Sequence, residues 1–404
     1  MKILHTADWH IGKKLHQFDL SEDVDLFVDW LADLIKLKEI DLLLISGDIF
    51  DLANPSSEAR KQYYRTLLKL KNTNCKIILT GGNHDSPNML NAPKEILHML
   101  DIHIIGGMTE EIKDLVICLP NPENPELVVA AIPFLRDADL RKANEGETYE
   151  DRLKIVQKGI ENTYLMAGKF CNDCYSGIPI IAMGHLYTAG ASSSDSERDI
   201  QMGNQAMFQA SRFGNDFAYI ALGHIHKPQR INNPIPAFYS GAPYPLSFSE
   251  RNDQKRVLFI DTENGFEPES IEIPSNRKLI RIQGTLEEIK SKLQHINTPS
   301  VLTSLIEIQM VEKQYSIETV QELEEIINNF NKPGFSIIHR SISFQNKIRG
   351  TGDLYDHKQS LHELSPLEVF GKLIDSQEIK EESKKELINA FQIILEEVEQ
   401  ELND

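Results

Sequence analysis

At five places in this 404-residue chain, histidine or aspartate residues stand shortly after a short apolar run. The most compact example is GHIH, in which His224 and His226 follow the run FAYIAL. In an extended segment, residues i and i+2 point to the same side. The two imidazoles can therefore hold one metal ion, contact two neighbouring ions, or be two surface histidines.

Four further runs are followed by residues of the same kind. Their motifs DWH, GDIFD, GNHD and GH supply Asp8, His10, Asp48, Asn83, His84 and His185. Oxygen and imidazole ligands without thiolates suit Mn²⁺, Fe²⁺ or Zn²⁺ better than a structural zinc cage. The set is too large for one ion and sufficient for two, and the carboxylate of Asp48 can bridge them. The pattern predicts that His224 and His226 face different ions, about 3.5–4 Å apart.

The runs that precede these residues have the length and composition of β-strands. They are KIL, DLLLI, KIILT, IPIIAM and FAYIAL, and glycine follows four of the five. Apolar residues at helical spacing separate several runs, at 24–35 and at 63–70. Strands that alternate with helices predict sheets covered by helices, and ligands in such folds bind beyond the carboxyl ends of the strands.

Each motif taken alone has an ordinary explanation. Asparagine and aspartate favour turns, and GHIH can be two solvated histidines in a loop. Five such groups in one chain, each just past a predicted strand, favour a common metal centre over five coincidences.

Composition and charge narrow the class of protein. Hydrophobic residues at 41% and charged residues at 25% indicate a globular protein, and the length indicates about two or three domains. No stretch approaches the roughly 18 apolar residues of a membrane helix, and no secretion signal is recognisable, so we expect a cytoplasmic protein without a membrane anchor. The formal net charge of −19 argues against broad, unaided binding to nucleic acid.

The four cysteines are too sparse for a disulfide framework. They are Cys75, Cys118, Cys171 and Cys174. The CNDC segment at 171–174 has CxxC spacing but no second pair, so it is half of a zinc site at most. We expect reduced thiols, with a metal or redox role for CNDC as the alternative.

With these motifs in place, the chain resembles the calcineurin-like metallophosphoesterase superfamily. DWH, GDIFD, GNHD, GH and GHIH are similar to its five motifs, while HTADWHIGKKLH and SPLEVF are similar to elements of the SbcD-type nucleases of SbcCD complexes. The resemblance implies an α/β fold, namely a two-sheet α/β sandwich with helices on its faces. It also implies a small α+β capping domain and a helical C-terminal tail.

The resemblance also implies roles for individual residues. The first metal would be held by Asp8, His10 and His226, and the second by Asn83, His185 and His224, with Asp48 between them. His84 corresponds to the catalytic histidine beside the metal ions. Asp51 stands three residues after Asp48, and by analogy with related phosphatases we expect an Asp51–His84 pair. A helix-capping aspartate is the alternative for Asp51.

The implied activity is hydrolysis of DNA phosphodiesters with two divalent ions, with Mn²⁺ expected and Mg²⁺, Fe²⁺ or Zn²⁺ as alternatives. Members of this family are ATP-dependent 3'–5' exonucleases on double-stranded DNA and endonucleases on single strands or hairpins. They act in DNA repair, recombination and replication. Its members work as homodimers within heterotetramers that contain an SbcC-type ATPase. A small-molecule phosphodiesterase or phosphatase, and a scaffold with a vestigial site, are the alternatives. The C-terminal region and the full ligand set favour the nuclease.

The predicted order of domains follows from changes of pattern along the chain. We predict a nuclease domain at 1–275, a capping domain at 276–345, a linker at 346–362 and a helical tail at 363–404. The capping domain should run strand, helix, strand, helix, strand. The tail carries an apolar helical stripe from Leu387 to Val398, which is typical of a helix that binds in a groove. The resemblance implies docking on the SbcC coiled coil, and packing on its own domain is the alternative.

Overall fold

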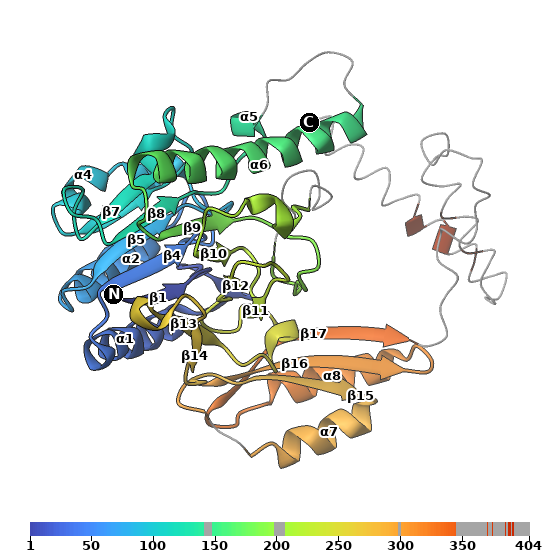
Figure 1. The fold of residues 1–404 in the computed structure, drawn as a ribbon. Coiled ribbons are helices and arrows are strands. Elements are labelled where there is room, and N and C mark those ends of the chain that lie inside the picture. Colours follow the sequence, from blue (N-terminus) through green and yellow to red (C-terminus); the bar gives the residue numbers. More distant parts are fainter. Residues whose placement is uncertain are drawn as a thin grey trace. The chain divides into compact units, whose positions relative to one another are not determined.

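The computed structural model describes residues 1–140, 148–197, 207–297 and 300–344, with isolated positions between 370 and 391 (Figure 1). The chain divides into two compact units. The first unit comprises Met1–Ile282, Ile296–Ile308 and Phe330–His339. The second comprises Gln283–His295, Gln309–Asn329 and the chain from Arg340 onward. The predicted linker and tail lie outside the described residues, apart from those isolated positions.

The first sheet has six strands in the order β14-β13-β1-β4-β5-β6. Their bounds are β1 Lys2–Thr6, β4 Leu42–Ser46, β5 Lys76–Thr80, β6 Ile102–Ile105, β13 Arg256–Asp261 and β14 Glu269–Glu272. β1, β4, β5 and β6 run parallel, whereas β13 and β14 join by antiparallel pairing. The carboxyl ends of β1, β4 and β5 therefore meet at one edge of the sheet.

The second sheet has six strands in the order β11-β12-β10-β9-β8-β7. Their bounds are β7 Val116–Leu119, β8 Leu127–Ala131, β9 Ile180–His185, β10 Tyr219–Gly223, β11 Gln229–Arg230 and β12 Ala237–Tyr239. β8, β9, β10 and β12 are parallel to one another. The five runs predicted as strands correspond to β1, β4, β5, β9 and β10, which confirms those predictions.

The alternation of side chains explains why the two sheets pack face to face. Successive residues of a strand point to opposite faces, and here both faces are apolar. One face of the first sheet packs on the second sheet through residues such as Ile3, Leu44, Val129 and Met183. The opposite face, which includes Leu4 and Leu43, packs against helices. The strands therefore appear in the sequence as continuous apolar runs.

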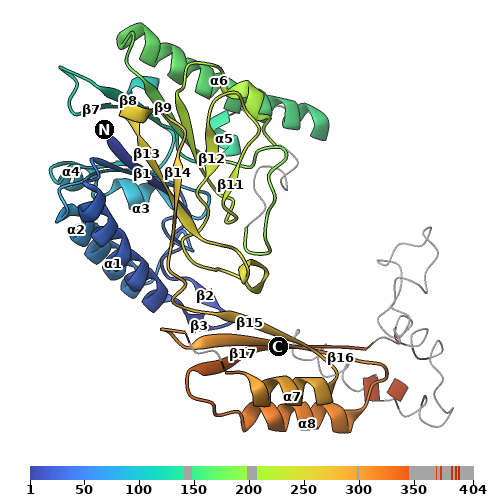
Figure 2. The same ribbon diagram turned by 60° about the horizontal axis from the view of Figure 1, so that its bottom comes forward.

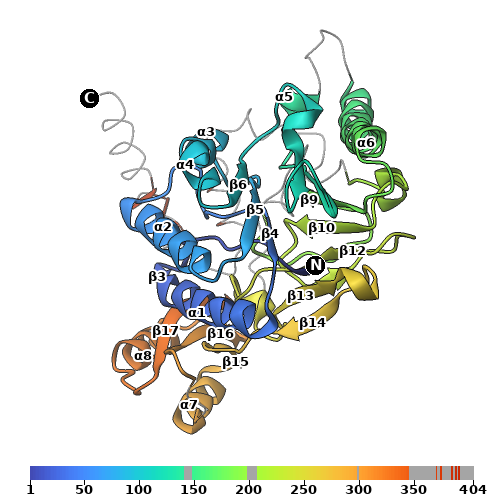
Figure 3. The same cartoon turned by 60° about the vertical axis from the view of Figure 1, so that its left-hand side comes forward.

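Helices cover the outer faces of both sheets (Figure 3). α1 (Ser21–Lys38) and α2 (Ser57–Lys71) cover the first sheet, and α6 (Tyr149–Cys174) covers the second. α1 buries Val24, Phe27, Leu31 and Ile35, which confirms the predicted stripe at 24–35. The shorter helices are α3 (Pro87–Asn91), α4 (Lys94–His98) and α5 (Asp137–Leu140).

The predicted strand and helix order after residue 276 is also confirmed. It runs β15 (Leu279–Gly284), α7 (Leu286–His295), β16 (Ser304–Glu312), α8 (Ile317–Asn328) and β17 (Phe335–Phe344). The three strands form one sheet in the order β15-β16-β17. α7 and α8 lie side by side (Figure 2). Within the described ranges, no helix combines the length and the apolar character needed to cross a bilayer.

Candidate metal centre

The segments at the carboxyl ends of five strands converge on one buried site. The strands are β1, β4 and β5 of the first sheet and β9 and β10 of the second. They supply Asp8, His10, Asp48, Asn83, His84, His185, His224 and His226. All of these side chains are buried except Asn83, which is half-buried. The structure therefore brings together residues that are up to 218 positions apart in the chain.

Asp8, His10 and His226 form the first group of potential ligands, with their ligand atoms within 4.8 Å of one another. The Nε2 atoms of His10 and His226 are 3.1 Å apart. Asp8 Oδ2 is buried and has no hydrogen-bond partner among the described residues. Because an unpartnered buried carboxylate oxygen is costly, its presence beside two imidazoles fits a metal ligand.

Asn83, His185 and His224 form the second group. Asn83 Oδ1 lies 2.9 Å from His185 Nε2 and 3.1 Å from His224 Nδ1. The other ring nitrogen of His185, Nδ1, lies 3.0 Å from the main-chain oxygen of Ser46. A carbonyl only accepts, so this contact places a proton on Nδ1 and, in the neutral ring, leaves Nε2 free to bind a metal.

Asp48 lies between the two groups. Its Oδ2 atom is 3.3 Å from His185 Nε2 and 3.6 Å from His10 Nε2. Its Oδ1 atom accepts a hydrogen bond of 2.9 Å from the main-chain N–H of His84. One carboxylate oxygen is thus held by the protein while the other faces both groups, which is the arrangement that a bridging ligand needs.

The two central aspartates have opposite protonation tendencies in the metal-free protein. Burial raises the pKa of Asp8 to about 7, although His185 and His226 oppose the shift. Burial also acts to raise the pKa of Asp48, but His185, His84 and His10 together lower it well below its usual value. Burial acts to lower the pKa of His185, yet Asp48 and Asp8 raise it to about 9. Metal binding should therefore release protons from this cluster.

Four of the residues in the centre have unusual backbone conformations. Their φ angles are 56° for Asp8, 46° for His10, 50° for Asp48 and 99° for His224. Residues with a side chain rarely adopt the positive-φ region, and each costs about 1–3 kcal/mol. Such strain persists where the surrounding fold holds the loop, and it is concentrated at functional sites.

Two glycines allow the loops to approach closely. A Cβ atom on Gly82 would clash with Asp48, and one on Gly223 would clash with the main-chain oxygen of Ser46. Ser46 ends β4 of the first sheet, and Gly223 ends β10 of the second. The absence of a side chain at Gly223 therefore lets the backbones of the two sheets come into contact next to the candidate metal ligands.

His84 forms a further potential ligand group with His10 and Asp48, and its Nε2 atom lies 3.9 Å from Asp48 Oδ2. Its Nδ1 atom is 2.7 Å from the main-chain oxygen of Asp51. The carboxylate of Asp51 lies 3.3 Å from His10 Nδ1 and accepts a hydrogen bond of 3.1 Å from Lys13 Nζ. Asp51 and His84 are thus neighbours, and this contact uses a main-chain atom of Asp51.

Sequence reasoning assigned no role to Asp85, the last residue of GNHD. Its buried carboxylate accepts hydrogen bonds from the main-chain N–H groups of Ile49, Phe50 and Gly82, at 3.0, 2.9 and 2.8 Å. It therefore holds together the two loops that carry Asp48 and His84. Burial and the nearby Asp48 raise its pKa to about 6 against these hydrogen bonds. Its place in the motif was the signal that could have identified it.

A second set of residues without a sequence motif lies behind His226. Ser196, Glu250 and Lys255 form a hydrogen-bonded network that reaches the outer ring nitrogen and the carbonyl of His226. These residues come from loops and from a position just before β13. No periodicity or motif marks such positions.

The CNDC segment forms the end of α6. Cys171 is buried and Cys174 is exposed, and both are free thiols. Burial raises the pKa of Cys171 to about 12, which keeps this thiol protonated near neutral pH. Among the described residues, no cysteine belongs to a group that could hold a metal ion.

Two family models each match one part of the chain, and known proteins match most of its length. Residues 1–228 match the family model of calcineurin-like phosphoesterases, and residues 275–378 match the model described as the type 5 capsule protein repressor C-terminal domain. The chain is 30% identical to the SbcD component of nuclease SbcCD from Escherichia coli over 401 residues, which cover 97% of each chain. It is 33% identical to the corresponding SbcD protein of Bacillus subtilis, over 86% of this chain and 88% of that relative.

Proposed function

The chain belongs to the calcineurin-like phosphoesterase family, and we propose that it cleaves DNA phosphodiesters at the centre described above as the SbcD component of an SbcCD-type nuclease. It is a metal-dependent hydrolase of the nuclease class. One observation supports the two-metal form of this proposal most directly. The potential ligand side chains form overlapping groups around His10 on one side and His185 on the other, and Oδ2 of Asp48 faces both sides.

The donor set fits two divalent ions. The first would be held by Asp8, His10 and His226, and the second by Asn83, His185 and His224, with Asp48 shared. Carboxylate, amide and imidazole donors suit Mn²⁺, Fe²⁺ or Zn²⁺. We propose Mn²⁺, as the family resemblance implies, with Mg²⁺, Fe²⁺ and Zn²⁺ as alternatives. When bound, such a pair polarises the phosphodiester and lowers the pKa of a water molecule.

The protein's own groups then have distinct tasks. We propose that His84 is the catalytic residue, because its Nε2 atom lies on the side of Asp48 that faces the ligand groups. The carbonyl of Asp51 accepts from His84 Nδ1 and so fixes the ring. When its ring is protonated on both nitrogens, His84 can donate the Nε2 proton to the leaving oxygen, or stabilise charge on the phosphate. The carboxylate of Asp51 lies 3.3 Å from His10 Nδ1 and can orient that ring.

DNA is favoured over a small substrate by the extent of the similarity. The nuclease relative of Escherichia coli is similar along 97% of this chain, and so also in the region beyond the catalytic core. A small-molecule phosphodiesterase would need only that core. A vestigial scaffold is disfavoured, since all seven predicted ligand residues are present and lie together.

The remaining parts of the proposal concern partners and organisation. We propose that residues 276–345 restrict which DNA reaches the metal ions, and that the tail at 363–404 binds an SbcC-type ATPase. The assembly would be a homodimer within a heterotetramer in the cytoplasm. Its activities would be ATP-dependent 3'–5' exonuclease on duplex DNA and endonuclease on single strands and hairpins.

The test is digestion of defined DNA. Linear duplex and hairpin substrates, and cyclic nucleotides as the alternative substrate, are incubated with the chain and Mn²⁺, with and without the SbcC-type ATPase and ATP. We expect metal-dependent DNA cleavage that a chelator stops and that the ATPase stimulates. Hydrolysis of cyclic nucleotides without DNA cleavage, in the presence of both proteins, would favour the small-molecule enzyme instead.

A further inference from the structure

The ring nitrogen Nδ1 of His226 contacts a side chain, whereas Nδ1 of His185 contacts a main-chain carbonyl. His226 Nδ1 lies 2.5 Å from Ser196 Oγ. Ser196 Oγ also forms a short hydrogen bond to Glu250 Oε1, which itself lies 3.6 Å from His226 Nδ1. Ser196 therefore connects the imidazole of His226 to the carboxylate of Glu250.

The chemistry of these groups sets the direction of the hydrogen bonds. An ionised carboxylate only accepts, so the hydroxyl proton of Ser196 must go to Glu250. The oxygen of Ser196 is then left to accept from His226, which places a proton on Nδ1. In the neutral ring this leaves the lone pair on Nε2, the atom 3.1 Å from His10 Nε2 in the first ligand group.

Glu250 is itself held in one position. Its side chain is fully buried, and Lys255 Nζ donates to its Oε2 atom at 2.5 Å. The main-chain N–H of Leu246 also donates to Oε2, at 3.3 Å. The hydroxyls of Ser247 and Ser194 donate to Oε1 at 3.2 and 3.3 Å. A buried carboxylate with this many donors is suited to remain ionised and to keep one orientation.

Lys255 holds the other side of the network. Its Nζ atom donates to the carbonyl oxygen of His226 at 3.1 Å, in addition to the bond to Glu250. It directly precedes β13, which pairs with β1, the strand that leads to Asp8 and His10. Lys255 therefore ties the backbone of His226, from the second sheet, to the sheet that supplies its two co-ligands.

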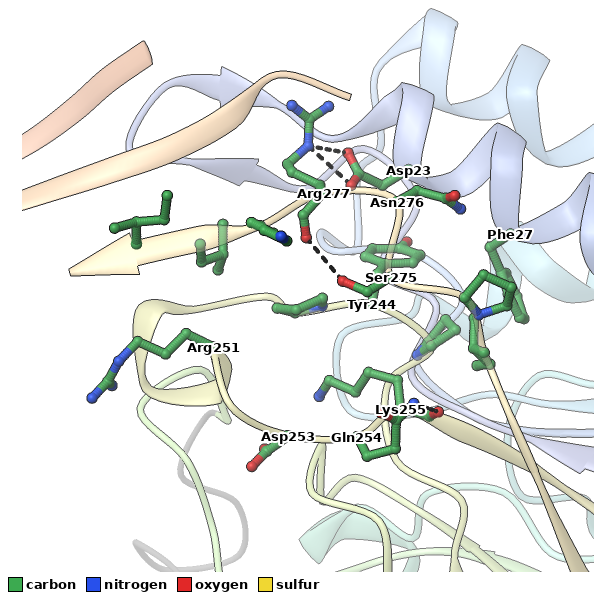
Figure 4. A pocket seen from close by; sticks show the side chains of 17 residues that line it. Asp23, Phe27, Tyr244, Arg251, Asp253, Gln254, Lys255, Ser275, Asn276 and Arg277 are labelled. Carbon is green, nitrogen blue, oxygen red and sulfur yellow. Dashed lines mark hydrogen bonds and ion pairs between the residues drawn. The ribbon is translucent and has the colours of Figure 1, made fainter. Parts of the chain in front are cut away.

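Lys255 also lines a pocket of about 290 Å³ within the first unit (Figure 4). The Asp23–Arg277 ion pair, with a separation of 2.9 Å, lies at one end of this pocket, and Asp253, Gln254 and Lys255 lie at the other.

Asp253 belongs to the same loop as Glu250, which makes it a suitable control for a change of charge in that loop.

We propose that Glu250 is the positioning residue of the first metal site, acting through Ser196 to fix the tautomer and orientation of His226. This inference rests on the proposed function, because it assumes that His226 binds a metal ion. Glu250 is fully buried and would act through Ser196 and His226, not on the substrate directly. Its contribution should appear in the affinity of the first ion, while the second group, held through Ser46 and Asn83, keeps its affinity.

The experiment measures Mn²⁺ binding to the metal-free full-length chain by calorimetry and by electron paramagnetic resonance, without DNA. Wild type should bind two ions and give the spectrum of a coupled pair. Glu250→Gln should weaken one ion about 10–100-fold and give the spectrum of a single ion, since outer-shell partners of metal-ligating histidines contribute on this scale. Asp253→Asn should behave as wild type.

A matched pair at Ser196 covers the case in which Glu250→Gln fails to fold. Ser196→Ala removes the connecting hydroxyl and should weaken the same ion, while Ser196→Thr keeps a hydroxyl and should restore it. Wild-type binding of both ions in Glu250→Gln and Ser196→Ala, or equal weakening of the two ions, would overturn the positioning role. Failure of wild type to bind two ions would instead count against the proposed function.

Discussion

The imidazole Nδ1 of His84 lies 2.7 Å from the main-chain carbonyl oxygen of Asp51, while the Asp51 carboxylate lies 3.3 Å from His10 Nδ1. One residue thus contacts the proposed catalytic histidine with its backbone and a proposed metal ligand with its side chain. Substitution of the side chain should separate these two contacts, because it removes the carboxylate and leaves the carbonyl in place.

Asp51→Asn should therefore affect metal binding more than the catalytic step. We expect a several-fold weaker first ion and a cleavage rate within a few-fold of wild type at saturating Mn²⁺. Titration of Mn²⁺ against the cleavage rate of a labelled duplex measures both quantities. A large loss of rate at saturating metal, with unchanged Mn²⁺ affinity, would show that the carboxylate acts on His84.

His84→Gln should have the opposite effect. The side chain is outside both ligand groups proposed for the two ions, so both should still bind in calorimetry. Loss of a general acid should lower the cleavage rate about 10²–10⁴-fold. Loss of an ion from this variant would instead make His84 a ligand.

Asp48→Asn should weaken both ions together, because Oδ2 of Asp48 faces both groups. The matched variant is His226→Gln, which removes a ligand from the first group only. Calorimetry with Mn²⁺ should show two weakened sites in Asp48→Asn and one in His226→Gln. Selective loss of one ion in Asp48→Asn would contradict the bridging role.

His5 should make the metal-free protein sensitive to acid. Its ring is fully buried on β1, with Nδ1 2.9 Å from the hydroxyl of Tyr219 on β10. Burial lowers its pKa from 6.5 to about 3. Well above pH 6.5 the ring is neutral in both the folded and the unfolded chain, so His5 does not lower the free energy of unfolding. As the pH falls from 6.5 towards 3, the unfolded chain binds a proton that the folded chain does not, so stability decreases.

The measurement is urea unfolding of wild type and His5→Gln in the presence of a chelator, between about pH 7 and pH 5. Other buried histidines contribute to both curves, so the difference between the two proteins isolates His5. The wild-type slope should be steeper by up to about 1.4 kcal/mol per pH unit. Equal slopes would mean that folding does not lower the pKa of His5.

Deletion of residues 361–404 should abolish binding of the SbcC-type ATPase and preserve Mn²⁺-dependent hydrolysis of a simple phosphodiester. The reason is that the proposed docking helix carries its own apolar stripe, while all seven ligand residues precede it. Co-purification of the two proteins tests the first part. Formation of an intact complex by the shortened chain would reject the docking role.

Much of the candidate metal centre could be predicted because each of its motifs is a short stretch of sequence that follows a strand. Parallel strands buried on both faces appear as continuous apolar runs, and the residues after them must meet at one edge of a sheet. This reasoning, with the motifs, identified Asp48 and His226 together with the strands before them. The strand and helix order after residue 276 was predictable for a similar reason, since its periodicity is regular.

What could not be predicted depends on tertiary contacts. Which atom of Asp51 meets His84 depends on the backbone path after β4. Glu250 acquires a role only because its loop packs behind His226, and that packing leaves no local pattern in the sequence. A role for Asp85 could have been predicted, since it belongs to GNHD. Its hydrogen bonds from Ile49 and Phe50 could not, because they depend on the folded loop.

The pairing of β13 between β1 and β14 also has a consequence for biosynthesis. β1 is synthesised long before its antiparallel neighbour, which ends only at Asp261. Until β13 has been made, one edge of β1 lacks its final partner, and the last histidine of the candidate centre, His226, is made only a few dozen residues before β13. We therefore expect the proposed ion pair to bind only after most of the first unit has been synthesised.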